Sequence, residues 1–379
     1  MKKRIFSGAQ PTGNLHIGNY LGALKNWVAL QNEFESFFCI VNLHAITLPQ
    51  NPQILRQKTL DLARIYLASG VDPQVSTVFV QSDVSEHAEL SWILNCIARM
   101  GELSRMTQFK EKSQKGEVYD NSFSLMRNTT THFAGIPITQ ATEQHVKTHS
   151  GGKKIITGTQ KINKIENERV GAGLFTYPVL MASDILLYQT DLVPIGQDQK
   201  QHLELTRDVA ERFNRDFGET FVIPEPFIPP VGAKIQSLAE PVKKMSKSDE
   251  NLNGSIFLLD DADTIIKKIK RAVTDSGTDI KFDESRPAIN NLLTIYQLLT
   301  GKTAEECEAD FDGKGYGHFK TALAETVVEF LKPFQERVKE FDDSELEKTL
   351  KIGAEKAKAI ARETLKDVYA KMGIVGAAN

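Results

Sequence analysis

Residues Arg4–Asn19 read RIFSGAQPTGNLHIGN, and this stretch decides the fold. It begins with Arg4–Phe6, a short apolar run that predicts a strand. The residues that follow, Tyr20–Leu30, carry apolar side chains three and four positions apart, which predicts a helix. Between them lie glycines and a proline, which are typical of a tight turn. A strand, a glycine-rich turn and a helix N-terminus favour a phosphate, because backbone N–H groups and the helix dipole converge there.

Taken alone, this stretch fits equally well a loop that holds a core histidine, His16. Strands and helices alternate after it, which predicts an α/β fold with a Rossmann-like parallel sheet covered on both faces. The predicted elements are strands Ser36–Val41 and Ser76–Gln81 and helices Pro52–Ser69 and Glu86–Met100. Ligands of such folds lie beyond the carboxyl ends of the strands. Residues Gly8–Asn19 are expected there, together with His44, which follows the second strand.

Composition sets few limits on function. The chain has 379 residues, 41% of them hydrophobic and 25% charged, which is ordinary for a globular protein of two domains. Its net charge of −3 argues only against indiscriminate binding of polyanions. No apolar run approaches the roughly eighteen residues of a membrane span, and no export leader is recognisable, so a cytoplasmic protein is expected. The three cysteines, Cys39, Cys96 and Cys307, form no pair typical of a zinc or iron–sulfur site.

Two further regions carry polar residues without a long apolar pattern. Residues 105–112 resemble the polar end of a helix, and a solvent-exposed charged face is the simplest interpretation. From about residue 114 to 168, threonine, asparagine and glycine dominate, which predicts an inserted, loop-rich segment. His145 and His149 are spaced as neighbours on a helix, with His132 nearby. Since no carboxylate or cysteine lies in register with them, we predict no protein-held metal site.

Leu174–Tyr188 is apolar on nearly all sides, which predicts a buried helix. Asp184 lies within it, where a charge needs a partner. It is either a capping or ion-paired aspartate, or a carboxylate that accepts a hydrogen bond from a ligand in an apolar pocket. The chain continues with a predicted short strand, Asp191–Gly196, and polar residues that open a helix.

Residues Lys243–Ser248 read KKMSKS and follow a proline-rich region. Lysines at such density usually form a solvent-exposed loop. Here they alternate with small hydroxyl residues, so the loop could bring ammonium groups to a polyphosphate as negative charge moves onto a leaving group.

The pair HIGN at residues 16–19 and KMSKS at residues 244–248 resembles the two signature sequences of class I aminoacyl-tRNA synthetases. Within that class, the chain resembles bacterial tryptophanyl-tRNA synthetases along nearly its whole length. The supporting matches lie at residues 6–11, 106–112, 184–188, 198–202 and 272–276. Two departures stand out: the first signature ends in Asn19 where a second histidine is common, and residues 114–168 match no familiar segment.

The resemblance implies ATP-dependent activation of L-tryptophan to tryptophanyl-adenylate, release of pyrophosphate, and transfer of the acyl group to tRNA(Trp). Catalysis then rests on positioning and on charge stabilisation by backbone amides, lysines and an Mg²⁺ ion that accompanies ATP. The implied ATP-binding residues are Gln10, Pro11, Thr12, Gly18, Asn19, Gly196, Gln197, Asp198, Ile235, Lys244, Met245, Ser246, Lys247 and Ser248. The implied catalytic residues are Gln10, Lys112, Lys244 and Lys247.

For the amino acid, the resemblance implies that Asp184 accepts the indole N–H, because indole offers one donor and no acceptor. Phe6, His44, Met181, Val193 and Ile195 would form the apolar walls. Tyr177 and Gln199 would reach the substrate ammonium.

The resemblance also implies a homodimer with two domains. Residues 1–258 would form the catalytic domain, and residues 259–379 a helical anticodon-binding domain whose last helix packs back on the first. The pattern predicts helices at about residues 260–271 and 344–371. A tyrosyl-tRNA synthetase-like enzyme, a small-molecule nucleotidyltransferase and a non-catalytic paralogue remain the alternatives.

Overall fold

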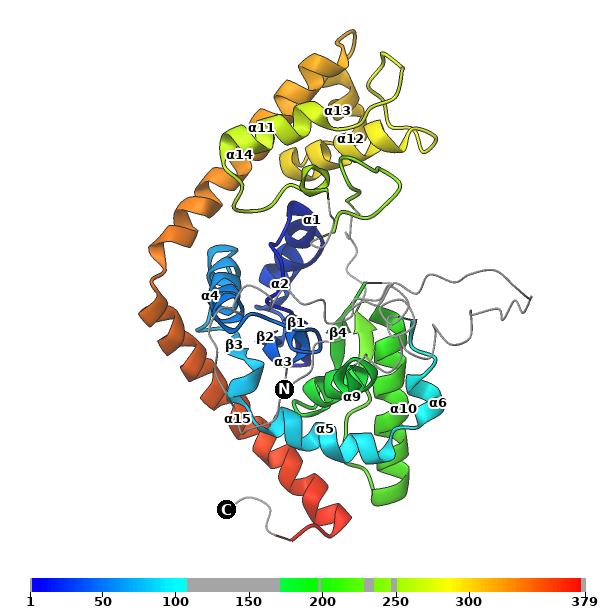
Figure 1. Ribbon diagram of the computed structural model, residues 1–379, viewed down its shortest axis with the longest axis vertical. Coiled ribbons are helices and arrows are strands. Elements are labelled where there is room, and N and C mark those ends of the chain that lie inside the picture. Colours follow the sequence, from blue (N-terminus) through cyan, green and yellow to red (C-terminus); the bar gives the residue numbers. More distant parts are fainter. Residues whose placement is uncertain (1, 108–170, 197–198, 228–234, 247–250, 376–379) are drawn as a thin grey trace, which may run out of the picture.

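The computed structural model describes residues 2–107, 171–196, 199–227, 235–246 and 251–375. In this part of the chain, five parallel strands form one sheet in the order β3-β2-β1-β4-β5 (Figure 1). The strands are β1 (Arg4–Ala9), β2 (Glu35–Ile40), β3 (Thr77–Val80), β4 (Leu192–Pro194) and β5 (Glu225–Phe227). The predicted α/β class is confirmed, and the first strand of the chain is the central one.

Helices connect and cover the strands. Before the C-terminal region they are α1 (Ile17–Asn19), the π-helical turn η1 (Tyr20–Leu24), α2 (Lys25–Leu30), α3 (Asn42–Ala45), α4 (Pro52–Ala68), the 3-10 turn η2 (Gln81–Asp83), α5 (Glu86–Ile97), α6 (Met100–Leu103), α9 (Ala172–Leu186) and α10 (Lys200–Phe217). The predicted helix at residues 86–100 ends early, at Ile97, because Ala98 has an extended backbone. Residues 114–168 and their three histidines lie outside the described residues.

The two faces of the sheet support separate buried clusters. Successive side chains of a strand point to opposite faces, so Ile5 and Phe6 of β1 belong to different clusters. On one face, Trp27 of α2 stacks on Phe38 with ring centroids 4.9 Å apart. On the other face, Tyr188 stacks on Phe6 and lies among residues of α5, α9 and α10. Strands buried on both faces explain the apolar runs without alternation.

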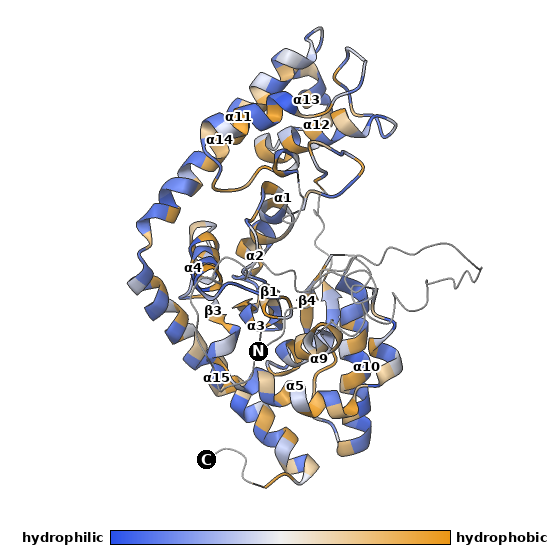
Figure 2. Cartoon of the chain, viewed as in Figure 1, coloured by the Kyte–Doolittle hydropathy of each residue, from blue (hydrophilic) through white to orange (hydrophobic). Residues whose placement is uncertain are grey.

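The C-terminal region is helical, as its pattern predicts. After the 3-10 turn η5 (Leu252–Gly254) come α11 (Ala262–Arg271), α12 (Pro287–Thr300), α13 (Ala304–Asp310), α14 (Tyr316–Glu340) and α15 (Asp343–Met372). Helix α14 contacts α11, α12 and α4. The outer faces of α14 and α15 are largely hydrophilic in Figure 2. None of the described helices is both long enough and apolar enough to cross a membrane.

The long helix α15 returns to the sheet and covers its edge. It packs against β3, α4 and α5. A Cβ atom added at Gly353 would lie 1.8 Å from the carbonyl oxygen of Val78, so the helix backbone rests directly on the edge strand. Buried Ala354, Ala357 and Ala361 keep the approach close along the same helix. This contact protects a strand edge that would otherwise be open to pairing.

Candidate active site

The N-terminal signature forms the strand, turn and helix N-terminus that its sequence predicts. Strand β1 ends at Ala9, and Gly13 turns the chain with a φ of 63°, a conformation that favours glycine. Residues 17–30 then run helically through α1, η1 and α2. His16 is the N-cap, and its backbone N–H donates to Oδ1 of Asn19 at 3.1 Å. Asn19 therefore helps to fix the start of the helix.

This signature pairs with a segment from far along the chain. The N–H of Ile17 donates to the carbonyl of Ile256 at 2.9 Å, and the N–H of Leu258 donates to the carbonyl of Leu15 at 2.9 Å. His16 and Phe257 form the bridge between these two bonds. The pairing places residues 255–258 directly against the N-terminal signature.

The lysine-rich signature joins the same structure through a short hairpin. The N–H of Met245 donates to the carbonyl of Ile235 at 3.0 Å. The hydroxyl of Ser255 donates to the carbonyl of Ser246 at 3.1 Å. On the other side, a Cβ atom on Gly18 would lie 3.3 Å from Cβ of Ile235. The two signatures are thus neighbours, and we call residues 15–18, 235–246 and 255–258 the junction.

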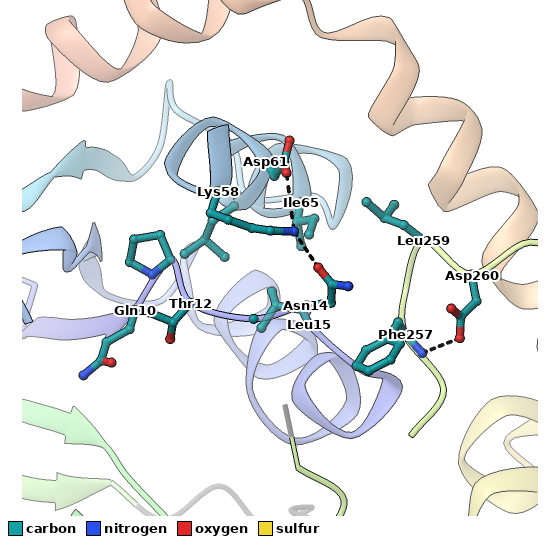
Figure 3. Close-up of a pocket in the computed structure, with 13 residues that line it drawn as sticks. Gln10, Thr12, Asn14, Leu15, Lys58, Asp61, Ile65, Phe257, Leu259 and Asp260 are labelled. Atoms are coloured by element: carbon teal, nitrogen blue, oxygen red, sulfur yellow. Dashed lines mark hydrogen bonds and ion pairs between the residues drawn. The ribbon is translucent and has the colours of Figure 1, made fainter. Parts of the chain in front are cut away.

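A cavity of about 240 Å³ opens beside the junction (Figure 3). Its walls come from the signature turn, from α4 and from residues 257–260. Lys58 of α4 reaches across it and donates to Oδ1 of Asn14 at 2.5 Å. The lining residues are Gln10, Pro11, Thr12, Gly13, Asn14, Leu15, Lys58, Asp61, Leu62, Ile65, Phe257, Leu259 and Asp260. The predicted residues Gln10, Pro11 and Thr12 therefore lie together on one wall.

The other residues assigned to ATP lie around the junction or outside the described part. Ile235 and Met245 are 2% and 1% exposed and contribute to the hydrophobic core, whereas Lys244 is exposed. Gly196 follows β4, the neighbour of β1, so it shares the carboxyl-end edge with the signature turn. The predictions for Lys112, Gln197, Asp198, Lys247 and Ser248 lie outside the described residues.

Asp184 lies on α9, beside the segments that follow β2 and β3, and is 1% exposed. Gln81 donates to its Oδ1 from Nε2 at 2.7 Å, and His87 approaches the same oxygen with Nδ1 at 2.6 Å. Nε2 of His44 lies 2.9 Å from Oδ2. Asp184 is therefore a paired aspartate, the first of the two roles that the sequence left open. Its second role, as an acceptor for a ligand, stays a prediction.

A second layer of contacts orients His87. Its Nε2 lies 2.8 Å from the hydroxyl of Tyr188, and its carbonyl accepts from the hydroxyl of Ser183 at 2.7 Å. Burial raises the pKa of Tyr188 well above its ordinary value, so this phenol keeps its proton and can donate it to Nε2. Nδ1 of His87 lies against Asp184 and can donate to the carboxylate from the neutral or the protonated ring. We call Asp184, His44, Gln81, His87 and Tyr188 the Asp184 cluster.

The charge of Asp184 is secured by its neighbours. Burial alone would raise the pKa of this carboxyl, since it disfavours the charged form. The charges of and hydrogen bonds from His87 and His44 outweigh burial and lower the pKa from 3.8 to about 2. A negative charge therefore persists inside an apolar layer at neutral pH.

The residues predicted as apolar walls belong largely to the buried cluster that contains residues of α9, the helix of Asp184. Phe6, Val193 and Ile195 are buried in the same cluster of side chains, and Met181 packs against it. His44, which was also predicted as a wall, contacts the carboxylate through a ring nitrogen. The hydroxyl of Tyr177, the residue predicted to reach the substrate ammonium, lies 2.7 Å from Nε2 of His202.

Sequence reasoning assigned no site role to Gln81, His87, Tyr188 or His202. Gln81 could have been found, since it is the last residue of the predicted strand Ser76–Gln81 and so lies at the ligand-binding edge. His87 gave no such signal, because one histidine at the start of an amphipathic helix is usually structural. Gln199 begins α10 as its N-cap, close to Gly196, whose carbonyl accepts its N–H at 3.0 Å. Among the described residues, no group of three or more His, Cys, Asp or Glu could hold a metal ion.

Comparison with known proteins identifies the family. The family of class I tRNA synthetases for tryptophan and tyrosine matches residues 1–127 and 144–332. The tryptophan–tRNA ligase of Wolinella succinogenes is 50% identical over 377 residues, covering 99% of this chain and 100% of that protein. The corresponding ligase of Caldanaerobacter subterraneus subsp. tengcongensis is also 50% identical, over 374 residues, covering 98% of this chain and 99% of that protein.

Solved structures support the same family. Tryptophanyl-tRNA synthetase from Mycoplasma pneumoniae has a TM-score of 0.79 at 35% identity, with 98% of both chains covered. The enzyme from Campylobacter jejuni, complexed with ADP and tryptophan, has a TM-score of 0.74 at 33% identity, covering 98% of this chain and 99% of that one. The resemblance seen in the sequence is therefore confirmed, and the chain belongs to the family of class I tRNA synthetases for tryptophan and tyrosine.

Proposed function

We propose that the protein is a tryptophan–tRNA ligase that activates L-tryptophan with ATP and then charges tRNA(Trp). In the first step, the tryptophan carboxylate attacks the α-phosphorus of ATP, a new P–O bond forms, and pyrophosphate leaves. In the second, a ribose hydroxyl at the tRNA 3′ end attacks the acyl carbonyl and AMP leaves. Full-length identity of about half to tryptophan–tRNA ligases supports this reaction.

The observation that carries the choice of amino acid is the buried carboxylate of Asp184. A carboxylate has about four lone-pair sites, and three protein groups lie on Asp184, so one site remains for a further donor. The indole N–H supplies a donor, whereas phenylalanine has none. Tyrosine also has a donor, but its hydroxyl lies at a different distance from the backbone than the indole N–H. Sites built around a polar partner reject ligands that lack it strongly.

We place the nucleotide at the junction and its adjoining turn. Gln10, Pro11, Thr12, Gly18 and Asn19 would approach the phosphates and ribose, while Gly196, Gln197 and Asp198 would hold the ribose. Lys244 and Lys247 would neutralise charge on the leaving pyrophosphate, with Lys112 assisting, and Ser246 and Ser248 would lie in the same loop. Ile235 and Met245 would support the adenine. Mg²⁺ would arrive on the ATP phosphates, which commonly hold this ion in nucleotide sites.

We divide the chain into a catalytic domain, residues 1–258, and a helical domain, residues 259–379, that would read the anticodon. The contact of α15 with β3 supports a helical domain anchored on the catalytic one. We also propose a cytoplasmic homodimer. Trp92 and Met100 are 73% and 72% exposed on α5 and α6, and large apolar side chains at a surface are typical of interfaces between subunits.

The direct test is ATP–pyrophosphate exchange with tryptophan and tyrosine side by side, followed by charging of tRNA(Trp). We expect tryptophan-dependent exchange, exchange with tyrosine lower by at least about 10⁴ in kcat/KM, and acylation of tRNA(Trp). A tyrosine-specific exchange would instead support a tyrosyl enzyme. Exchange without any tRNA charging would support a small-molecule nucleotidyltransferase.

A further inference from the structure

One lysine of the C-terminal helices is buried beneath the junction. Lys268 of α11 is 6% exposed and is the only buried lysine or arginine among the residues that the structure describes. Its Nζ donates to the carbonyl of Ser255 at 2.8 Å and to Oδ2 of Asp260 at 2.7 Å. It also lies 4.4 Å from the centroid of the Phe257 ring. A buried lysine therefore contacts three residues of one short segment.

That segment is the part of the junction that touches both signatures. Residues 255–258 bond to Leu15 and Ile17 through the backbone, and the Ser255 hydroxyl bonds to the Ser246 carbonyl. Asp260 accepts the N–H of Phe257 at 2.9 Å as well as the lysine, and both residues line the cavity in Figure 3. Displacing Lys268 would thus disturb the signature turn and the lysine loop together.

A second C-terminal helix fixes the other strand of the hairpin. Asn291 of α12 is 5% exposed, and its Oδ1 accepts the N–H of Gln236 at 2.8 Å. Its Nδ2 donates to the carbonyl of the same residue at 3.0 Å. One side chain therefore satisfies both backbone groups of Gln236, next to Ile235 and opposite Lys244.

Stability alone is a poor account of these groups. Taking a lysine and an aspartate out of water costs free energy that close packing of apolar residues does not. A buried polar network instead fixes one geometry, because each member needs its partners in place. The geometry that Lys268 and Asn291 fix is that of the segments which carry the two signatures.

We propose that Lys268 and Asn291 are positioning residues for adenylate formation, holding the junction in the geometry that ATP requires. This inference rests on the proposed function. Through these two residues, the C-terminal helices would influence the proposed ATP site, since α11 and α12 both pack on α14. The Asp184 cluster lies on the opposite face of the sheet, so tryptophan binding should be independent of these two residues.

The test compares Lys268→Met with Lys267→Met, a matched change at an exposed lysine on the same helix. In ATP–pyrophosphate exchange we expect Lys268→Met to raise KM for ATP or lower kcat by about tenfold or more. The equilibrium dissociation constant for tryptophan should stay within about twofold of wild type. Lys268→Arg should recover part of the loss because it keeps the charge, and Lys267→Met should behave as wild type.

Asn291→Asp tests the second contact while Lys268 stays intact. This change removes the donor to the Gln236 carbonyl, so we expect the same rise in KM for ATP or fall in kcat, with tryptophan binding retained. Melting temperatures identify any variant that fails to fold. Folded Lys268→Met and Asn291→Asp variants with wild-type ATP kinetics would overturn the inference, as would equal losses in ATP and tryptophan binding. Failure of wild-type exchange with tryptophan would instead overturn the proposed function.

Discussion

The Asp184 cluster and the junction differ in the kind of hydrogen bond that holds them together and in the task to which each is suited. The cluster consists of side chains that bond to one another across α3, η2, α5 and α9, with its charge matched before any substrate binds. The junction is assembled mainly through backbone hydrogen bonds between segments far apart in the sequence, and it leaves Lys244 exposed. The first arrangement is suited to choosing one side chain. The second is suited to holding a loop near a phosphate while its ammonium groups stay available.

The comparison teaches where function and stability can be separated. In the Asp184 cluster the carboxylate proposed to bind the indole is itself buried in the core, so a change there should affect both binding and stability. At the junction, the exposed lysine can be removed without touching the backbone pairing. The following predictions test that difference, from the largest expected effect to the smallest.

Asp184→Ala should have the largest effect. It removes the acceptor for the indole N–H and leaves the donors of Gln81 and His87 without their carboxylate. We expect kcat/KM for tryptophan to fall by about 10³ or more, and the preference over tyrosine to fall with it. Exchange assays with both amino acids, together with thermal melting, measure the two effects. Unchanged discrimination against tyrosine would refute the role of this residue.

Lys244→Ala should lower adenylate formation by about a hundredfold, because one positive group near the leaving pyrophosphate is lost. Tryptophan binding and melting temperature should be unchanged, since the side chain is exposed. The same split is expected for Lys247→Ala. The matched control is Lys243→Ala, whose ammonium lies 2.5 Å from Glu240 and should not serve the phosphates. Equal losses in exchange and in tryptophan binding would contradict the assignment.

Lowering the pH should reduce the unfolding free energy by protonating Asp184. Its folded pKa of about 2 lies below its ordinary value of 3.8, so the stabilisation is complete above about pH 4 and disappears as the pH falls toward 2. The difference corresponds to about 2 kcal/mol of unfolding free energy. Urea unfolding at pH 5 and at pH 2.5 should show a larger acid-induced loss in wild type than in Asp184→Asn. Parallel losses in the two proteins would show that this carboxylate is not linked to folding.

Tyr188→Phe should have the smallest effect. It leaves the ring in the core but removes the hydroxyl that orients His87, which should cost about 1 kcal/mol of unfolding free energy. KM for tryptophan should rise a few-fold, because the carboxylate is less firmly held. Tyr66→Phe is the control, since Tyr66 is a buried tyrosine of the other cluster. A rise in KM for tryptophan in both variants would mean that general loosening, rather than the His87 contact, is responsible.

Much of this molecule could be predicted from local pattern. The central strand, the glycine-rich turn and the helices at residues 52–69, 174–188 and 344–371 follow from apolar periodicity and from glycine and proline. The residues around Asp184 could not all be found in this way. His87 and Gln81 meet the carboxylate only because α5 and η2 return beside α9, and no spacing in the sequence expresses that contact. The pairing of residues 15–17 with residues 256–258 could not be predicted from the sequence for the same reason.

The claim on which the rest depends is that Asp184 selects tryptophan through the indole N–H. The most direct measurement compares tryptophan with its benzothiophene analogue, in which sulfur replaces the N–H, in wild type and in Asp184→Ala. In ATP–pyrophosphate exchange, wild type should favour tryptophan by about a hundredfold in kcat/KM, and Asp184→Ala should use the two almost equally. Equal use of both by wild type, or a preference that survives in Asp184→Ala, would contradict the account.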